Sequence, residues 1–307
     1  MFSVQRTFQV VAAVAMAAVL GTSAIVNADV KLPASLIRIP ESTETLFVAE
    51  ISTAQFHRFD RSGDGVILSS SHYMSTGQNG SGKQRSGDRR TPLGVYFVTE
   101  QLDTSELHEK YGATAFPLDY PNAWDRLANR DGDGIWIHGV MPQGGRRPER
   151  DTDGCIALPN EDLSLLAPDF RDNVTPVLVT LAVDWVGAAE NRALRSELEG
   201  RIGEWADVQQ TGDLYAYLSL YSDDFQRWGM NKAEWSSLRM QTENLHAIQQ
   251  VSVSELLLVA YPEEEGVYLS RFQTEIVAEN RKTVSRTRLY WRRDADGSLR
   301  IVAEDDG

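Results

Sequence analysis

The pattern of apolar residues changes once along this chain of 307 residues, close to residue 185. Before that point, short apolar runs alternate with turn clusters rich in Gly, Asp and Asn, as at 60–65 and 129–134. This pattern is typical of β-strands joined by tight turns, and it predicts a mostly-β domain. The expected strands are 46–51, 55–59, 65–70, 94–99, 135–138 and 176–183. A short helix is expected from Asn160, with Asn160 as its cap.

After residue 185, Leu194, Leu198 and Ile202 recur at a spacing of four and predict a long helix over 188–210. Beyond residue 249 the chain alternates polar and apolar residues, which predicts strands at 251–261, 267–279, 283–293 and 299–304. Helices followed by an antiparallel meander indicate an α+β domain. No linker rich in Pro or Ser separates the two segments, so we expect the two domains to abut.

The first residues have the features of a secretory signal peptide. Arg6 precedes an apolar stretch at 10–20, and Val26-Asn27-Ala28 is a cleavage site of the small-residue type. We therefore expect residues 1–28 to be removed, 29–184 and 185–307 to form the two domains, and the mature protein to be periplasmic or secreted. An uncleaved membrane anchor is the alternative.

Charge and cysteine content exclude several classes of function. A net charge of −14 argues against a general nucleic-acid-binding protein, because phosphate binding needs a basic surface. The single cysteine excludes an intramolecular disulfide and a zinc site built on several cysteines. The acidic turns at 60–65 and 129–134 resemble half of a calcium loop but lack its final Glu, so neither metal nor cofactor is expected.

One cysteine and one histidine suggest nucleophilic chemistry. Cys155 ends the segment Thr152-Asp153-Gly154-Cys155, and His138 lies upstream at the end of an expected strand, followed by Gly139. A cysteine nucleophile needs a base that takes the thiol proton, and glycine beside it leaves backbone N–H groups open to an oxyanion. Spacing alone fits a buried structural cysteine and an ordinary histidine as well.

The residues around this pair resemble the YkuD family of L,D-transpeptidases. That family carries a His, a gap, and then Ser/Thr-His-Gly-Cys, which is close to His138 and the segment 152–155. The segments 91–96 (TPLGVY), 46–49, 55–56 and 175–179 also resemble family segments, so that the likeness covers about 44–183. It implies a mostly-β catalytic domain and acyl transfer on peptidoglycan stem peptides.

The resemblance also implies a role for each matching residue. Cys155 resembles the nucleophile and His138 the general base, and the carbonyl of Gly139 matches the one that orients the imidazole. The N–H groups of Gly154 and Cys155 match the oxyanion donors.

Three further residues are assigned to substrate binding: Thr152, Asp153 and Tyr120, with packing of its own loop as the alternative for Tyr120. Thr152 matches the family pattern, whereas Asp153 replaces a frequent His and Ala157 a frequent Arg or Asn. We expect the Asp153 side chain to face solvent or the arginines at 146–150.

The second segment resembles the nuclear-transport-factor-2-like (SnoaL-like) fold, which is joined to YkuD domains in some wall-trimming enzymes. Its Arg286, Arg288 and Arg292 share one strand face, a candidate for docking an anionic cell-wall polymer or a protein partner. The chain is thus expected to be an L,D-transpeptidase. The alternatives are an L,D-carboxypeptidase that trims tetrapeptide stems to tripeptides and a non-catalytic wall-binding protein.

Overall fold

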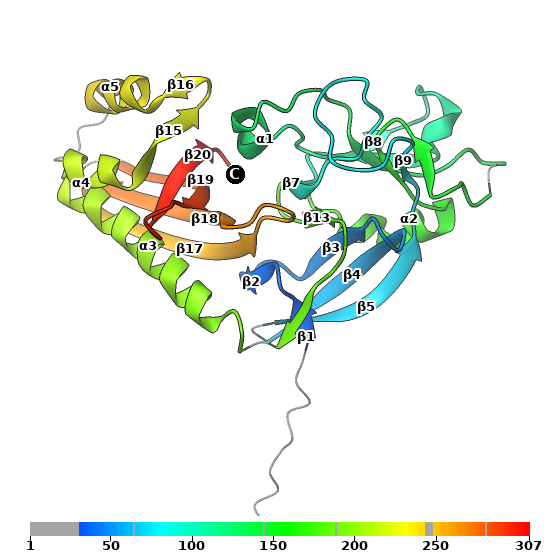
Figure 1. Ribbon diagram of the computed structural model, residues 1–307, viewed down its shortest axis with the longest axis horizontal. Helices are drawn as coiled ribbons and strands as arrows, with labels where there is room; N and C mark the ends of the chain where they lie inside the picture. The colour runs from blue at the N-terminus through cyan, green and yellow to red at the C-terminus, as the bar shows by residue number, and fades with distance from the viewer. Residues whose placement is uncertain (1–30, 64, 144, 188, 243–247, 280) are drawn as a thin grey trace, which may run out of the picture.

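The computed structural model describes residues 31–63, 65–143, 145–187, 189–242, 248–279 and 281–307, arranged as two β-rich halves side by side (Figure 1). The expected signal peptide, residues 1–28, lies outside the described residues. Within those ranges, no helix is long and apolar enough to cross a membrane.

A five-stranded sheet forms the base of the N-terminal half. Its strands, in spatial order, are β5 (Gly65–Tyr73), β4 (Gln55–Ser62), β3 (Thr45–Glu50), β13 (Pro176–Thr180) and β7 (Gly94–Phe97). The central strands β3 and β13 pair in parallel, and their apolar runs are almost completely buried. Continuous apolar runs fit such strands because both faces of the sheet are covered.

The remaining strands of this half carry the segments around His138 and Cys155. One sheet has the order β12 (Ile156–Ala157), β10 (Trp136–His138), β9 (Thr114–Pro117) and β8 (Leu102–Asp103). A two-stranded sheet pairs β11 (Arg150–Thr152) with β6 (Thr76–Gly77). The short helices are η1 (Glu109–Tyr111), α1 (Ala123–Leu127), α2 (Asn160–Leu166) and η2 (Ala167–Asp169).

The cap of α2 differs from the prediction. Pro159 is the N-cap residue, and Asn160 is the first helical residue. The Asn160 side chain instead accepts from the Val140 N–H and donates to the Val140 carbonyl, both at 2.9 Å. Asn160 therefore fixes the chain that follows His138 rather than the start of the helix.

The C-terminal half folds three helices onto a curved seven-stranded sheet (Figure 1). The helices are α3 (Arg192–Thr211), α4 (Leu214–Ser219) and α5 (Lys232–Thr242). The strand order is β16 (Met230–Asn231), β15 (Tyr221–Arg227), β20 (Leu299–Asp305), β19 (Arg281–Arg293), β18 (Val267–Ala278), β17 (Ile248–Ala260) and β2 (Leu36–Arg38). The prediction of a mostly-β domain followed by an α+β domain is confirmed.

Strand β2 departs from the predicted division at residue 184. It pairs with β17 at the edge of the C-terminal sheet, and its Ile37 belongs to the core of that half. Strand β1 (Lys31–Pro33) likewise pairs with β14 (Trp185–Gly187) beyond the boundary. Three-residue strands carry too little periodicity to be assigned to a sheet from sequence.

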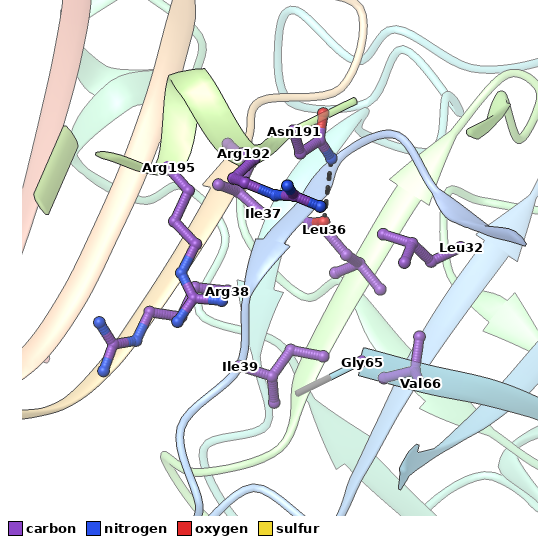
Figure 2. A pocket seen from close by; sticks show the side chains of 10 residues that line it. All are labelled: Leu32, Leu36, Ile37, Arg38, Ile39, Gly65, Val66, Asn191, Arg192 and Arg195. Carbon is purple, nitrogen blue, oxygen red and sulfur yellow. Dashed lines mark hydrogen bonds between the residues drawn. The ribbon is translucent and has the colours of Figure 1, made fainter. Parts of the chain in front are cut away.

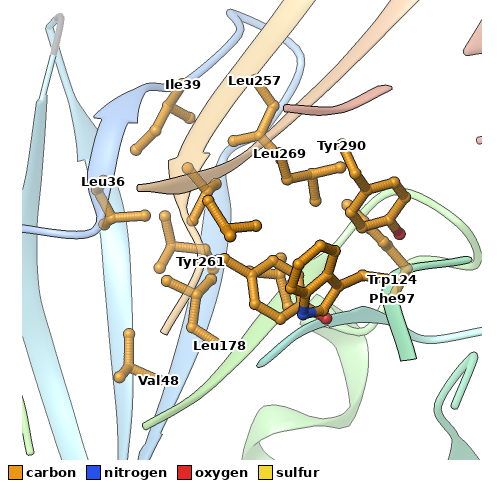
Figure 3. Packing of buried hydrophobic residues seen from close by; sticks show 14 of the residues in the cluster. Leu36, Ile39, Val48, Phe97, Trp124, Leu178, Leu257, Tyr261, Leu269 and Tyr290 are labelled. Carbon is orange, nitrogen blue, oxygen red and sulfur yellow. The ribbon is translucent and has the colours of Figure 1, made fainter. Parts of the chain in front are cut away.

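The two halves abut as expected and share one apolar core. Trp124 and Leu178 of the N-terminal half pack in one cluster with Leu257, Tyr261 and Tyr290 of the C-terminal half (Figure 3). A shared core of this kind favours a fixed arrangement of the halves over free motion.

Polar contacts reinforce this interface. Asn122 Nδ2 donates to Tyr261 Oη at 2.9 Å, Arg130 pairs with Glu264, and Arg288 pairs with Asp119. Beside β2, a pocket of about 260 Å³ opens between the start of α3 and the tip of β5, with Arg38, Arg192 and Arg195 along one wall (Figure 2).

The arginine face predicted to dock a wall polymer is largely engaged inside the molecule. Arg288 is buried between Asp119 and Asp305, and Arg292 pairs with Asp224 and Asp294. Of the three predicted arginines, only Arg286 has no ion pair among the described residues, so they do not form a common open surface.

Candidate active site

Two adjacent parallel strands bring Cys155 and His138 together. In the pairing of β10 with β12, Ile137 lies opposite Ile156 and His138 opposite Ala157. Extending this register by one residue places Cys155 beside Trp136. Because side chains alternate across a strand, His138 and Cys155 share the face opposite to Ile137 and Ile156, which are both fully buried in the core.

The His138 ring is buried, with 3% of its surface exposed, and oriented by the backbone. Its Nδ1 lies 2.6 Å from the Gly139 carbonyl, which can only accept, so Nδ1 carries the proton and Nε2 is free to take one. Burial lowers the pKa of His138 from 6.5 to about 4, assisted by the cations Arg147 and Lys110, although the bond to Gly139 acts in the opposite direction. At neutral pH the imidazole is therefore an uncharged base.

Cys155 is a free, partly exposed cysteine immediately before β12. Its Sγ lies 3.3 Å from the Gly134 carbonyl, to which the thiol donates. Loss of solvent around the sulfur raises the pKa of Cys155. The backbone of Trp136 and the Lys110 ammonium oppose this increase, whereas Asp153 adds to it. The resting pair is thus a neutral thiol and a neutral imidazole.

Thr152, predicted to contact substrate, instead shapes the turn that presents the cysteine. The Thr152 side chain is buried, and its Oγ1 accepts from the Gly154 N–H at 3.1 Å and donates to the Cys155 carbonyl at 2.7 Å. Because that bond engages the Gly154 N–H, the predicted oxyanion donor at Gly154 is not free in this structure. The Cys155 N–H stays a predicted donor.

Glycine is required at position 154 for two reasons. Its φ of +129° is rarely adopted by residues with a side chain, and an added Cβ would lie 2.8 Å from the Arg90 carbonyl oxygen. The turn that carries Cys155 therefore packs directly on the backbone of the preceding loop.

Tyr120, also predicted to bind substrate, lies in the core rather than at the mouth of the site. Its ring is 6% exposed and packs edge-on against Tyr96, with 5.9 Å between ring centroids. Its hydroxyl donates to the Asp131 carbonyl at 3.0 Å. These contacts leave Tyr120 a structural role.

Asp153 faces solvent, as predicted, with 65% of its side chain exposed. Its carboxylate lies 3.7 Å from Arg89 Nε and 3.9 Å from Lys110 Nζ. These partners differ from the predicted arginines at 146–150: Arg147 pairs with Asp151, and Arg146 stacks on Tyr73. Asp153 thus lies between the cations Arg89 and Lys110, and Lys110 also acts on Cys155.

An aromatic and cationic wall beside His138 was missed by sequence reasoning. The Tyr111 ring packs edge-on against the His138 ring, with 5.2 Å between their centroids, and lies 4.8 Å, centroid to centroid, from the Trp136 ring. Lys110 Nζ lies 4.9 Å from the centroid of the Tyr111 ring. The Gly139 N–H donates to the Tyr111 carbonyl at 3.1 Å. Trp136 could have been found, since it lies two residues before His138 on the same strand face; nothing in the sequence links η1 to the site.

The acidic turn at 129–134 contacts both the loop that contains Ser86 and the thiol of Cys155. Asp131 Oδ1 accepts from the Ser86 N–H at 2.6 Å, and Gly134 supplies the carbonyl at the thiol. Across the described ranges, no group of three or more His, Cys, Asp or Glu side chains is arranged to hold a metal ion.

Comparison with known proteins identifies the class of each half. Residues 46–179 match the L,D-transpeptidase catalytic domain model (YkuD), and residues 197–305 match the Cds6 C-terminal NTF2-like domain model. The chain therefore consists of a YkuD L,D-transpeptidase catalytic domain followed by an NTF2-like domain, as the resemblance implied.

Two solved structures share this two-domain arrangement. One is Bd1075 of Bdellovibrio bacteriovorus, with a TM-score of 0.74 and 24% identity over 90% of this chain and 98% of that chain. The other is the helical cell shape determining protein Pgp2 of Campylobacter jejuni, with a TM-score of 0.73 and 24% identity over 88% and 94%. At this identity the likeness establishes the fold. None of the curated proteins matches the chain in sequence.

Proposed function

We propose that this protein is a cysteine-dependent acyltransferase of the L,D-transpeptidase type that acts on peptidoglycan stem peptides. The observation that carries the proposal is the placement of Cys155 beside the β10 strand that ends in His138, whose Nδ1–H is held by Gly139. This placement leaves Nε2 as the only ring nitrogen that can accept a proton. A non-catalytic wall-binding protein has no need of this arrangement.

The neutral resting pair defines how the reaction starts. His138 Nε2 takes the proton from the Cys155 thiol as Sγ attacks the carbonyl carbon of an L-centre, and the C=O electron pair moves to oxygen. When the tetrahedral intermediate collapses, the C–N bond breaks and His138 returns the proton to the leaving D-amino acid. A thioester on Cys155 remains.

The thioester can be resolved in two ways. Attack by an amine of a second stem peptide forms a crosslink, and attack by water completes an L,D-carboxypeptidase reaction. In both, His138 takes a proton from the incoming nucleophile and returns it to the sulfur. Arg89 and Lys110 at the mouth offer positive charge to stem peptides, whose carboxylates are anionic.

The proposed location is the periplasm or the cell exterior, where peptidoglycan lies. The signal-peptide pattern of residues 1–28 supports this proposal. Determining the first residue of the protein in a fractionated cell tests it: a start near Asp29 in the periplasmic or extracellular fraction is expected. Residue 1 in the membrane fraction would show that the apolar segment is an uncleaved anchor, and protein in the cytoplasmic fraction would contradict the location.

Digestion of purified muropeptides tests the reaction, with Cys155→Ala as the matched control. Mass spectrometry of the products separates the outcomes, since new dimers indicate transpeptidation and tripeptides indicate trimming. Unchanged muropeptides with folded wild-type protein would contradict both reactions and favour the wall-binding alternative.

A further inference from the structure

A cleft of about 300 Å³ lies between the two halves of the molecule, on the face of the C-terminal sheet that turns toward the N-terminal half. Ser42 and Arg171 line it from the N-terminal half, and Glu255, Arg271 and Arg286 line it from the C-terminal half. Three arginines thus converge on one cleft in a protein whose net charge is −14.

Arg271, on β18, is buried and lacks a charged partner. Only 8% of its surface is exposed, and its guanidinium lies 4.6 Å from the centre of the Phe97 ring. Its Nη2 donates to the Asn173 carbonyl, but its buried Nε has no partner among the described residues. No described carboxylate lies within ion-pair distance of Arg271.

The charges around Arg271 make this burial unfavourable. Burial, together with repulsion from Arg286 and Arg288, lowers the pKa of Arg271 to about 10, against a weaker attraction to Asp119. Asp119 itself is paired with Arg288. A guanidinium remains charged at neutral pH, and an uncompensated buried charge is strongly destabilising.

The other two arginines also contact neutral carbonyls. Arg286 Nη1 donates to the same Asn173 carbonyl at 3.4 Å, and Arg171 Nη1 donates to the Ser42 carbonyl at 3.3 Å. In the described part of the chain, neither forms an ion pair. The Glu255 carboxylate in the cleft is bound by the Ser42 N–H, at 3.3 Å, and by the Ser42 hydroxyl.

Other arginines on the same strands show the contrast. Arg288, Arg292 and Arg293 on β19 each pair with at least one carboxylate. Arg271 and Arg286 differ from these three arginines, because they donate to the neutral Asn173 carbonyl.

We propose that the cleft is a binding site for a small oxyanion ligand, such as a phosphate group or a pair of carboxylates, held by Arg271, Arg286 and Arg171. Guanidinium groups match such anions with paired hydrogen bonds, and the volume admits a phosphate with a small substituent. Because both halves contribute arginines, the bound anion bridges them. The site is separate from Cys155 and independent of its chemistry.

Titration of the purified protein with inorganic phosphate, followed by calorimetry and by thermal melting, tests the proposal. Malonate in a second series shows whether paired carboxylates bind as phosphate does. We expect saturable binding and a higher melting temperature with at least one of the two anions. Arg286→Ala should weaken binding at least 10-fold, and Arg281→Ala, an exposed arginine on the same strand, should leave it unchanged.

Arg271→Met gives a result that a merely structural arginine would not give. It should abolish the response to the anion and leave the melting temperature in anion-free buffer equal to or above that of the wild type, because it removes an unpaired buried charge.

Two results would overturn the proposal. One is a wild-type protein that responds to neither phosphate nor malonate. The other is Arg271→Met melting well below the wild type in anion-free buffer while Arg286→Ala leaves binding unchanged. In that case Arg271 has a structural role, through its contacts with Phe97 and the Asn173 carbonyl.

Discussion

The buried, neutral His138 makes a quantitative prediction about stability and pH. Its pKa falls from 6.5 to about 4 on folding, so the unfolded chain binds a proton at this residue more readily than the folded chain. Above pH 6.5 both states are neutral and the histidine has no effect. As the pH falls through that value, the free energy of unfolding decreases, until the folded state is also protonated near pH 4.

The size of the effect follows from the shift. Each pKa unit corresponds to about 1.4 kcal/mol, so the full loss is about 3 kcal/mol, of which about 2 kcal/mol is already lost at pH 5. His138→Asn cannot titrate, and its side-chain amide can still donate to the Gly139 carbonyl. When the pH falls from 8 to 5, the free energy of unfolding of this variant should therefore decrease by about 2 kcal/mol less than that of the wild type.

Urea unfolding at the two pH values measures this effect as a difference of differences, in which the effects of all other titrating groups cancel. Equal pH dependence of the wild type and His138→Asn would refute the assignment of a buried, neutral His138.

Three further predictions address the site and the division into halves. Lys110→Met should raise the pKa of Cys155, and Asp153→Asn should lower it, so the pH profiles of iodoacetamide labelling should move in opposite directions; shifts in the same direction would contradict the roles given to these charges. Gly154→Ala should cost at least about 1 kcal/mol of stability and most of the activity, because the added Cβ meets the Arg90 carbonyl; a fully active, equally stable variant would contradict this geometry. A fragment of residues 185–307 should melt at a lower temperature than the whole chain, or without cooperativity, because it lacks β2 and Ile37; a melt equal to that of the whole chain would show that β2 is dispensable.

Regular patterns in the sequence predict much of this fold. The alternation along 251–304 and the leucine spacing in α3 place the C-terminal elements within a few residues of their positions in the structure. The apolar runs of β3 and β13 do the same for the N-terminal sheet. Long elements that bury one whole face leave this mark in the sequence, and three-residue strands such as β1 and β2 do not.

Local and distant features of the site were predictable to different degrees. The hydrogen bond from His138 to Gly139 joins neighbours in sequence, and the resemblance implied it. The inward contacts of Thr152 and Tyr120 could not be predicted, because their partners are set by the folded chain. Lys110 and Tyr111 reach His138 through tertiary packing alone.

The position of β2 has a consequence for how the protein is made. Leu36 and Arg38 pair with residues 259 and 258 of β17, so β2 can take its place only when the last third of the chain is present. Asn122, the N-cap residue of α1, likewise forms its hydrogen bond to the Tyr261 hydroxyl only when the C-terminal half is present. Such contacts raise the contact order and delay folding until synthesis is nearly complete. A chain interrupted after residue 184 would contain Cys155 and His138 and still lack the partners of Asn122 and Trp124 in the C-terminal half, so α1 would lose part of its packing.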